Sequence, residues 1–456
     1  MPKIKSEHGE ELKRKVIERA KKEDVKFVRA QFTDINGALK STAIPVEGLE
    51  GALYDGIGFD GSSVKGYTPI EESDMILMPD PSTFALLPWR PAPRGVARMI
   101  CDVYLPDGRR FEGDPRYVAQ RAAEMARKMG YVYKCGPELE FFMFQKESNN
   151  GIPLAIDHGG YFDFHPLDLA EDIRRDMVFA LENFGIKVEM SHHEVAPSQY
   201  EVDFKFGDLV TTADRVMTYK MVAKTITHLK GFVATFMPKP LFGENGSGMH
   251  THQSLWSANG DRNVFFDAKK RREDALSSEA IYFIGGLLEH ARALSAVVAP
   301  IVNSYKRLVP GYEAPVYISW AHKNRSALIR VPEYFPGMEK ALRAEFRCPD
   351  PSCNPYLAFA CMCAAGLDGI KRHTMPPEPV EADIYEMNAE ERAKHGISSL
   401  PSTLADALCE LEKDEVLKEA LGKHVYENFM KVKRDEWDEF RIRVTEWEVE
   451  KYLKNA

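Results

Sequence analysis

The sequence predicts an α+β fold with two domains, residues 1–113 and residues 114–456, and three observations indicate it. The chain has 456 residues, and at roughly 150 residues per domain this length corresponds to two or three domains. Up to residue 112 the sequence is rich in Gly and Pro, which is typical of short strands and loops. Beyond that point, strands with polar residues on one face alternate with long helical segments, without a regular βαβ order.

The first domain begins with a helix followed by a strand, and a helix start marks its end. Residues 11–23 form a charged helical pattern, and residues 26–32 alternate as a strand. At the boundary, Asp114 is a good N-cap and Pro115 suits the first helical position, while Gly130 can end this helix. We therefore place the domain boundary just before this helix.

Helical patterns dominate the second domain. Four of them cover residues 168–184, 212–230, 279–298 and 354–372. The last sixty residues are helical in pattern and strongly charged. They end in an aromatic and aliphatic stripe that we expect on one polar helix, formed by Trp437, Phe440, Val444 and Trp447.

Charge and composition exclude several classes of protein. Lys and Arg total 60 against 69 for Asp and Glu, so we expect no general affinity for nucleic acid. The longest nearly apolar run, residues 356–367, is shorter than the roughly 18 residues of a membrane span, so no membrane partner is expected. The N-terminus lacks a secretory signal, and the seven cysteines lack zinc or redox spacing. These features predict a cytoplasmic protein with free thiols.

Carboxylates gather in two segments of the second domain. Glu138 and Glu140 lie two residues apart in a predicted strand, so both point to one face. Two adjacent buried carboxylates repel each other unless a cation lies between them; the alternative is a solvated face. Glu194 and Glu201 follow, seven residues apart, across a loop that contains proline.

Histidines and arginines lie near these carboxylates in the predicted sheet. His250 and His252 occupy one strand face after a glycine-rich loop, and Arg343, Glu345 and Arg347 share another. A single histidine of this kind is more often structural than a ligand, but four strands that each present Glu or His are harder to explain structurally. Carboxylates outnumber imidazoles and no cysteine contributes, so the pattern favours Mg²⁺ or Mn²⁺ over zinc.

Five arginines narrow the chemistry further. Forked guanidinium groups match carboxylate and phosphate oxygens, and the group consists of Arg307, Arg325, Arg330, Arg343 and Arg347. Hard cations with converging arginines are what phosphoryl transfer requires. The sequence contains no phosphate-binding loop of the GxxxxGK[ST] type. The residues alone therefore indicate a metal-dependent phosphoryl-transfer enzyme with an anionic substrate, and do not name it.

Seven ordered motifs resemble those of type I glutamine synthetases over almost the whole chain. They are Phe59-Asp-Gly-Ser-Ser63, Glu71-Glu-Ser-Asp74, Gly136-Pro-Glu-Leu-Glu-Phe-Phe142, His192-His-Glu-Val-Ala196, Glu244-Asn-Gly-Ser-Gly-Met-His-Thr-His252, Lys306-Arg-Leu-Val-Pro-Gly-Tyr-Glu-Ala-Pro315 and Asn324-Arg-Ser-Ala327. The short connection from Glu140 to Tyr161 resembles the α subtype, and the chain is similar to archaeal members.

The resemblance implies an N-terminal β-grasp domain, a larger catalytic domain with a curved antiparallel sheet flanked by helices, and a dodecamer of two stacked hexameric rings. Each active site would lie between neighbouring subunits. One Mg²⁺ would be held by Glu140, Glu194 and Glu201. A second, at the ATP phosphates, would be held by Glu138, His250 and Glu345.

The same resemblance assigns the substrate contacts of a glutamate–ammonia ligase. Glutamate would contact Asn245, Gly246, Arg307, Glu313, Arg325 and Arg347. ATP would contact Glu189, His252, Ser254, Arg330 and Arg343. Ammonium would be bound by Asp60 and Ser63 of one subunit with Tyr161 and Glu194 of the next. The catalytic groups would be Asp60 as proton acceptor, Glu313 as a flap that excludes water, and Arg325 and Arg330 at the transferring phosphoryl group.

Several residues bear on how the activity would be regulated. Pro69 stands where glutamine-inhibited relatives carry an arginine, and proline offers neither charge nor N–H, so we expect weak glutamine feedback. Tyr385 lies where related enzymes are adenylylated, but without their flanking pattern, which favours an ordinary loop tyrosine. Three arginines would form a 2-oxoglutarate clamp between subunits, namely Arg90, Arg174 and Arg175; the alternative is that they are solvated or form structural ion pairs. A PII-type signal protein is a further partner that the resemblance suggests.

Three other classes of protein fit part of the pattern. A ligase that joins glutamate to a larger amine would use the same metals and ATP, but it would need a different ammonium pocket from the intact one here. A non-catalytic scaffold would not need all six predicted metal ligands. Without the resemblance, the residues would indicate a metallohydrolase of another family.

Overall fold

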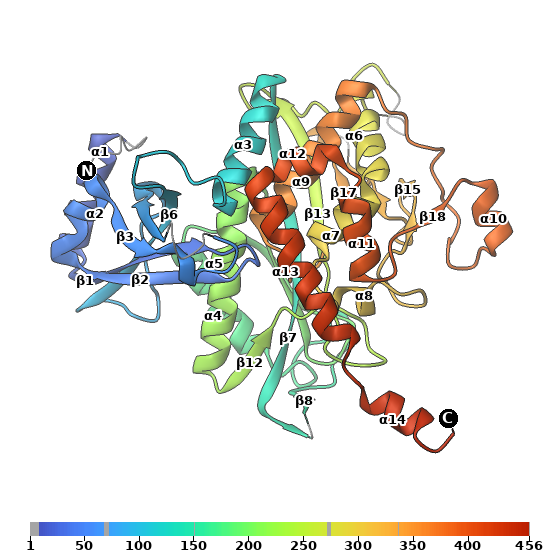
Figure 1. Ribbon diagram of the computed structural model, residues 1–456, viewed down its shortest axis with the longest axis horizontal. Helices are drawn as coiled ribbons and strands as arrows, with labels where there is room; N and C mark the ends of the chain where they lie inside the picture. Colours follow the sequence, from blue (N-terminus) through green and yellow to red (C-terminus); the bar gives the residue numbers. More distant parts are fainter. Residues whose placement is uncertain (1–8, 68–72, 150, 271–274, 336, 456) are drawn as a thin grey trace.

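A computed structural model describes residues 9–67, 73–149, 151–270, 275–335 and 337–455 of the chain (Figure 1). Two bodies lie side by side in it: a small sheet with two helices near the N-terminus, and a larger sheet covered by helices. Pro69 and Glu71 lie outside the described residues, so the expectations that rest on them stay predictions.

The first body is a six-stranded mixed sheet in which β1 and β6 run parallel at the centre. Its order is β2-β1-β6-β4-β3, with β5 paired to β6. The strands are β1 (Val25–Thr33), β2 (Leu39–Pro45), β3 (Ile57–Asp60), β4 (Asp74–Pro79), β5 (Ala85–Leu86) and β6 (Gly95–Tyr104). Helices α1 (Glu10–Lys22) and α2 (Leu49–Asp55) bury Val16, Leu49 and Leu53 against this sheet. The predicted first helix and first strand are confirmed.

The second body is built on a ten-stranded sheet, and the 19-residue strand β7 is its centre. The main order is β15-β16-β17-β13-β7-β10-β9, and three further strands pair with β7. The strands are β7 (Tyr131–Asn149), β8 (Ile152–Ala155), β9 (Val188–His193), β10 (Gln199–Phe204), β11 (Gly207–Asp208), β12 (Phe232–Thr235), β13 (Met249–Ser257), β15 (Trp320–Ala321), β16 (Ile329–Arg330) and β17 (Ala344–Phe346). A separate pair joins β14 (Tyr317–Ile318) and β18 (Ser398–Ser399).

Helices cover one face of this sheet and leave the other for polar side chains (Figure 1). Leu139, Phe141 and Met143 of β7 point into the helical core, so Glu138 and Glu140 point the other way. The helices are α3 (Pro115–Lys128), α4 (Glu171–Asn183), α5 (Leu209–Leu229), α6 (Ser278–Glu289), α7 (Ala291–Val298), α8 (Ser304–Arg307), α9 (Pro355–Arg372), α10 (Ala389–Lys394), α11 (Leu404–Leu411), α12 (Glu415–Leu421), α13 (Lys423–Arg441) and α14 (Glu446–Tyr452).

A buried arginine ties the two bodies together. Arg116 begins α3 and is capped there by Asp114, as predicted. Its guanidinium donates to Asp102 at 2.7 Å and Asp80 at 2.8 Å in the first body, and to Asp214 of α5 at 2.9 Å. A buried guanidinium that satisfies three carboxylates on separate elements fixes their relative positions, because removal of any partner would leave buried charge uncompensated.

Two expectations about helices are wrong. The pattern over residues 279–298 is not one helix, since α6 and α7 meet at His290 with a bend of 73°. The C-terminal stripe is not on one helix either: α13 ends at Arg441, and Thr445 caps a new helix through a capping box with Glu448. Trp447 therefore lies on α14, which projects from the body (Figure 1).

The bent pair also bears on whether the chain could cross a membrane. Among the described residues, no single helix is long and apolar enough to cross a bilayer, whereas α6 and α7 taken together pass by length and composition. Most of their residues are buried inside the helical core. All seven cysteines are free, as expected.

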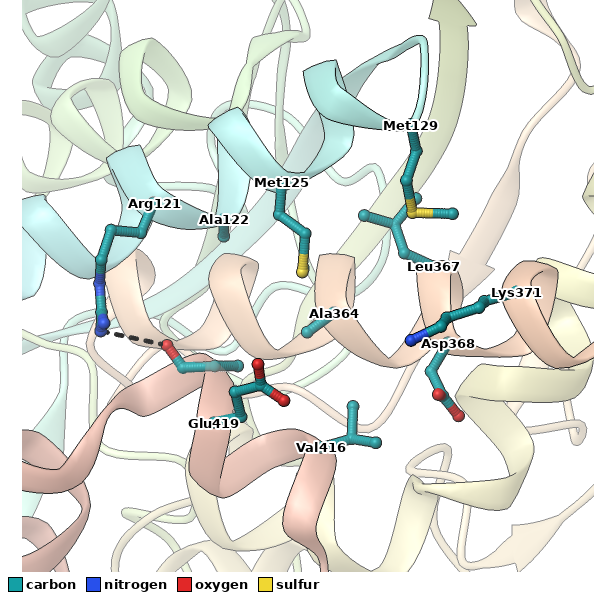
Figure 2. A pocket seen from close by; sticks show the side chains of 11 residues that line it. Arg121, Ala122, Met125, Met129, Ala364, Leu367, Asp368, Lys371, Val416 and Glu419 are labelled. Atoms are coloured by element: carbon teal, nitrogen blue, oxygen red, sulfur yellow. Dashed lines mark hydrogen bonds between the residues drawn. The ribbon is translucent and has the colours of Figure 1, made fainter.

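A cavity of about 220 Å³ lies between α3, α9 and α12 (Figure 2). Met125, Met129 and Leu367 form its apolar part. At one edge, Arg121 donates to the carbonyl oxygen of Leu421 at 3.0 Å and so satisfies the C-terminal end of α12. The charged rim also includes Lys371.

His290 joins three helices at the bend. Its Nδ1 lies 2.6 Å from Asp414, the N-cap of α12, and its Nε2 lies 3.2 Å from Asp368 of α9. Burial lowers the pKa of His290, but the hydrogen bonds and charges of Asp414 and Asp368 outweigh it, so the pKa is raised overall. The protonated imidazole therefore stabilises the junction.

We predict that His290→Gln lowers stability more at acidic than at alkaline pH. The contribution of a group with a raised folded-state pKa is complete below its unfolded value of about 6.5, and it is lost as pH rises through the folded value. The expected loss is about 2 kcal/mol at pH 6, the scale of hydrogen bonds to charged groups, and less at pH 8.5. Chemical unfolding at both pH values measures it. The exposed His228→Gln is the control, and an equal loss at both pH values would contradict the prediction.

Candidate active site

Three strand pairings bring the predicted acidic and histidine residues to one face of the large sheet. Across β7 and β13, Glu138 is paired with His250. On the other side of β7, Glu140 is paired with Glu201 of β10. Glu345 of β17 is paired with His252 of β13. The period of two that placed each group on one strand face is confirmed, and antiparallel pairing adds those faces together.

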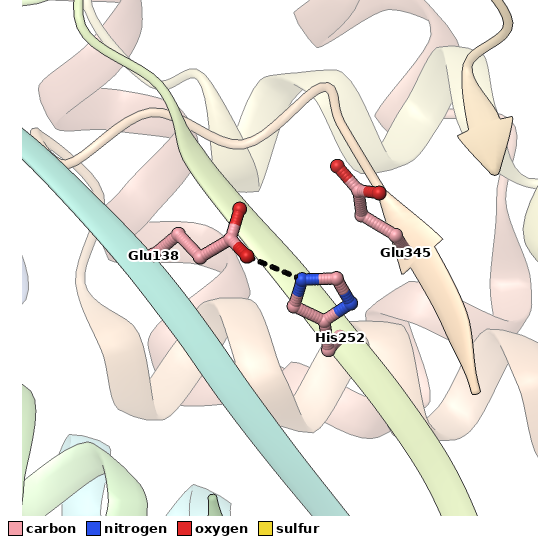
Figure 3. Close-up of side chains that lie close together, drawn as sticks. All are labelled: Glu138, His252 and Glu345. Carbon is pink, nitrogen blue, oxygen red and sulfur yellow. Dashed lines mark hydrogen bonds and ion pairs between the residues drawn. The ribbon is translucent and has the colours of Figure 1, made fainter. Parts of the chain in front are cut away.

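The first cluster surrounds Glu138. Figure 3 shows His252 directed at this carboxylate, with a distance of 2.6 Å from Nε2 to Oε1, while Glu345 faces both from the neighbouring strand. One ligand atom from each of these three residues lies within 4.8 Å of the others. His250 Nδ1 lies 3.7 Å from Glu138 and 3.7 Å from Glu345. The three residues predicted for one metal thus converge, and His252, predicted for ATP, joins them.

Arginines keep Glu345 ionised inside the protein. Burial raises the pKa of Glu345, but Arg347 and the two histidines of the cluster lower it to about 2. Arg330 Nε lies 2.5 Å from one carboxylate oxygen and Arg347 Nη1 lies 2.8 Å from the other. Burial and Arg347 lower the pKa of His250 to about 4, so this imidazole is neutral and able to coordinate a metal.

The second cluster has much less positive charge. His192 Nε2 lies 2.8 Å from Glu194 and 3.8 Å from Glu201. Glu140 accepts hydrogen bonds from Gln199 Nε2 at 2.8 Å and from the Gly248 N–H at 3.0 Å. Burial and the neighbouring carboxylates raise the pKa of both Glu140 and Glu201. These carboxylates lie too close together for all of them to be ionised without a cation.

The donor set fits divalent cations with oxygen ligands. Carboxylates that raise one another's pKa are the arrangement that a bound Mg²⁺ or Mn²⁺ neutralises. Glu140, Glu194 and Glu201 have the composition to hold one such ion, and the cluster around Glu138 to hold another. The neutral imidazole of His250 adds one nitrogen ligand to a set in which carboxylates predominate.

Sequence reasoning missed Asp203 and His192. Asp203 follows Glu201 by two residues on β10, so strand alternation places it on the same face and could have identified it. Ligand atoms of His192, Glu201 and Asp203 lie within 4.8 Å of one another. Burial and Glu138 raise the pKa of Asp203 to about 7.

A cavity of about 420 Å³ begins at Glu138 and extends along β13. Among the residues that line it are four predicted to contact ATP, namely Glu189, His252, Ser254 and Arg343. Arg343 Nε lies 3.0 Å from His252 Nδ1, and Phe206, stacked on Trp256, adds an aromatic wall. Arg330, the fifth predicted ATP residue, is paired with Glu345 instead.

A second cavity, of about 830 Å³, contains four of the six predicted glutamate residues, Asn245, Glu313, Arg325 and Arg347. Arg307 is buried behind it and donates to the carbonyl oxygens of Cys348 at 2.9 Å and Arg347 at 3.2 Å. Gly246 is closely surrounded: a Cβ at this position would lie 2.4 Å from the Pro238 carbonyl oxygen and 3.1 Å from Cγ of Arg307. Tyr385 lines the same cavity and donates to the Ala314 carbonyl at 2.8 Å, consistent with an ordinary loop tyrosine.

The predicted ammonium residues fall into two places. Tyr161 lies beside the second cluster, with its ring 5.7 Å from that of His192, and burial together with the charge of Glu194 raises its pKa. Asp60 and Ser63 lie at the edge of the first sheet, where the Ser63 hydroxyl donates to Asp60 at 3.1 Å. Within the part of the chain that the structure describes, the hydrogen bonds of Asp60 stay in its own turn. One subunit therefore does not assemble this set.

Arg174 forms a buried ion pair, which was the structural alternative to the predicted 2-oxoglutarate clamp. Its guanidinium is buried, binds Asp168 at 2.9 and 2.6 Å, and donates to Ser191 Oγ at 3.1 Å. These contacts engage part of the planar guanidinium group, and the clamp stays a prediction for all three arginines. Arg175 is exposed and lies 2.8 Å from Asp172, and Arg90 is exposed.

Together, an acidic face, a nucleotide-sized cavity and an arginine-lined cavity define an enzyme that uses divalent cations and a phosphate-bearing substrate. Family models give the particular family: residues 24–106 match "Glutamine synthetase, beta-Grasp domain" and residues 112–452 match "Glutamine synthetase, catalytic domain". The chain belongs to the glutamine synthetase family. Members of this family are oligomeric and use glutamate, ammonia, ATP and a divalent metal.

Similar proteins agree over nearly the full length. The chain is 55% identical over 442 residues to the glutamine synthetase of Methanosarcina mazei, covering 97% of each. It is 56% identical over 446 residues to that of Methanocaldococcus jannaschii, covering 96% of this chain and 97% of the relative. Among solved structures, a GmaS–ADP complex matches with a TM-score of 0.87 at 33% identity, covering 96% of this chain and 99% of the other. Plasmodium falciparum glutamine synthetase matches with a TM-score of 0.86 at 27% identity, covering 99% and 100%.

We predict that divalent cations stabilise the protein increasingly as pH rises. Without a cation, carboxylates with a raised folded-state pKa lose stability as pH rises above their unfolded value of about 4.3, because the folded state must release protons from crowded groups. A cation at one hundred times its dissociation constant adds about 2.7 kcal/mol per site. Thermal unfolding with Mg²⁺ or EDTA at pH 5.5 and pH 8 measures the difference. Glu201→Gln should reduce it, and an equal stabilisation at both pH values would contradict the prediction.

Proposed function

We propose that this protein catalyses ATP-dependent ligation of ammonia to L-glutamate, giving L-glutamine, ADP and phosphate through a γ-glutamyl phosphate intermediate. The observation that carries the proposal is the meeting of three features on one sheet face: the nucleotide-sized cavity, the carboxylate clusters, and the arginine-lined cavity. Residues 24–106 and 112–452 also match the two domains of the family. The first domain is proposed to end at residue 113, close to the start of the second match at residue 112.

The chemistry explains why phosphate and arginine are both needed. A carboxylate is a poor electrophile, because its leaving group would be oxide; phosphorylation by ATP replaces that leaving group with phosphate. Glutamate is proposed to lie in the larger cavity, against Asn245, Arg325 and Arg347. Arg325 and Arg330 would stabilise negative charge on the transferring group.

Further residues are proposed to bind the cations and protect the intermediate. Glu140, Glu194 and Glu201 would hold one Mg²⁺ or Mn²⁺, and Glu138, His250 and Glu345 the other; the cations supply charge neutralisation at the phosphates. Gly246 and Arg307 would complete the glutamate site. Glu313 lines the same cavity and would exclude water from the acyl phosphate.

Ammonium is proposed to bind where two subunits meet. Tyr161 and Glu194 supply one side, and Asp60 with Ser63 of a neighbouring subunit supplies the other, with Asp60 as proton acceptor. Hydrogen bonds from Ser62 and Ser63 lower the pKa of Asp60, so this carboxylate is ionised and attracts a cation. The exposed position of the Asp60 turn at a sheet edge supports a role between subunits.

We predict that ADP release requires glutamate and ammonium together, and that methylamine and putrescine do not replace ammonium. Glutamate dependence separates the proposal from a hydrolase, and the amine preference separates it from a ligase for larger amines. Asp60→Ala should raise the ammonium requirement at least tenfold while ATP binding persists. The control is Asp55→Ala, an exposed carboxylate of the same domain. ADP release with putrescine alone, or an unchanged ammonium requirement in Asp60→Ala, would contradict the proposal.

The assembly is proposed to be a cytoplasmic dodecamer of two stacked hexameric rings. The exposed apolar residues of the C-terminal segment support contact between rings, because such surface is unfavourable in water. Val444, Trp447 and Leu453 are 77%, 58% and 75% exposed in the single chain. The segment would thus join subunits although it is not one continuous helix. A PII-type signal protein is a further proposed partner.

Control is proposed to come from 2-oxoglutarate through Arg90, Arg174 and Arg175, and glutamine feedback is proposed to be weak because of Pro69. We predict that 2-oxoglutarate raises activity at subsaturating glutamate, and that Arg90→Ala abolishes the increase. Arg109→Ala, another exposed arginine of the first domain, is the control. Pro69→Arg should increase inhibition by glutamine. A flat titration would exclude the activator, and strong inhibition of the unmodified protein by glutamine would show that Pro69 does not prevent feedback.

A further inference from the structure

The loop after β8 is held by one buried carboxylate. The Asp157 side chain is 1% exposed and accepts hydrogen bonds from four donors. Oδ1 accepts from His193 Nε2 at 3.0 Å and from the Ser198 N–H at 2.9 Å. Oδ2 accepts from the Leu169 N–H at 3.2 Å and from the Tyr200 hydroxyl. The four donors come from β9, β10, the turn between these strands, and the far end of the loop.

His193 extends this network to the backbone of Glu194. The imidazole is completely buried, and its Nδ1 lies 2.6 Å from the Glu194 carbonyl oxygen. The ring of Tyr200 packs edge-on against it, with centroids 4.9 Å apart. Asp157 therefore fixes the orientation of a ring whose other nitrogen holds the main chain of Glu194.

The same network holds the backbone beside Tyr161. The N–H of Phe162 donates to the His193 carbonyl at 3.0 Å. Phe162 has φ of 62° and Ser198 has φ of 60°. A bulky residue adopts this left-handed conformation only where its surroundings impose it. The contacts around Asp157 thus hold the backbone of Phe162 and Ser198 in this left-handed conformation.

Close packing leaves the loop little freedom to shift. A Cβ on Gly159 would lie 2.9 Å from His193 Nε2, so the loop backbone rests directly on the imidazole. Ser198 Oγ accepts from the N–H groups of Ile156 at 2.7 Å and Asp157 at 3.2 Å, which pairs the turn with the start of the loop.

We propose that Asp157 is a positioning residue for ammonium: through His193 and Ser198 it sets the separation of Tyr161 from Glu194. This inference rests on the proposed ammonium site. The predicted site residues include neither Asp157 nor His193, although His193 lies within one of the resemblance motifs. His193 and Ser198 connect Asp157 to the segments that carry Tyr161 and Glu194. Loss of the Asp157 carboxylate therefore changes the spacing of the proposed ammonium pocket and leaves the ATP and glutamate cavities in place.

The test compares Asp157→Asn with the unmodified enzyme in steady-state kinetics. The amide keeps the volume but cannot accept from all four donors. KM for ammonium should rise about 10- to 100-fold, the usual effect of losing an outer-shell partner, whereas KM for ATP and for glutamate should change less than about threefold. His193→Asn places an amide nitrogen near the position of Nδ1, keeps the contact to the Glu194 carbonyl, and should raise KM for ammonium less than His193→Ala does.

Asp114→Asn is the matched control, since Asp114 is also a buried carboxylate and caps α3 in the domain junction. It should leave KM for ammonium unchanged. Equal increases in all three KM values for Asp157→Asn would show a general structural role and overturn the proposal. Tyr161→Phe distinguishes failure of the positioning role of Asp157 from failure of the proposed ammonium site. A raised ammonium requirement in Tyr161→Phe with normal ammonium use in Asp157→Asn overturns this inference alone, and normal ammonium use in both overturns the proposed ammonium site with it.

Discussion

The antiparallel pairing of β7 with β13 on one side and β10 on the other is the constraint on which the site depends. Each strand alone offers one or two acidic or imidazole groups to a face. Pairing adds them together, so Glu138 meets His250 and Glu140 meets Glu201. The opposite face of β7 is committed to the helical core through Leu139 and Phe141. A shift of one residue in register would exchange these faces and bury the carboxylates among the helices.

The two halves of this sheet face differ in their balance of charge. Around Glu345, two arginines supply the positive charge, and the carboxylate is ionised without outside help. Around Glu140 and Glu201, negative groups outnumber positive ones, and the pKa of both carboxylates is raised. The first half is permanently charged, whereas the second depends on what it binds. That asymmetry is useful at a site where a nucleotide and a cation must enter and leave.

Strand periodicity and helix-capping residues predicted much of this arrangement. The faces of Glu138 and His250, and the start of α3 at Pro115, follow from residues close in sequence. The break at His290 could not be predicted in this way, because its partners Asp368 and Asp414 are remote in sequence. The helical pattern over residues 279–298 therefore does not predict the bend at His290.

Residues whose role depends on distant partners were the hardest to predict. The sequence assigns Arg174 to a ligand clamp and gives no sign of its buried ion pair with Asp168 of the preceding loop. Asp203 was missed although alternation with Glu201 was visible. Asp60 is a further limit, since one chain's sequence cannot show which surface of another copy it meets. Local chemistry was therefore predictable, and its assembly across long separations was not.

The length of β7 has a consequence for how the protein opens. Strands β8, β10, β11, β12 and β13 all pair with it, so its amide groups are hydrogen-bonded along most of both edges. Exchange of such amides with deuterium requires unfolding of the whole sheet, whereas the loop that carries Tyr161 is held through the side chains of Asp157 and His193 and not by strand pairing. On gradual heating we therefore expect this loop to open before the sheet, while the acidic face keeps its shape until the sheet itself unfolds.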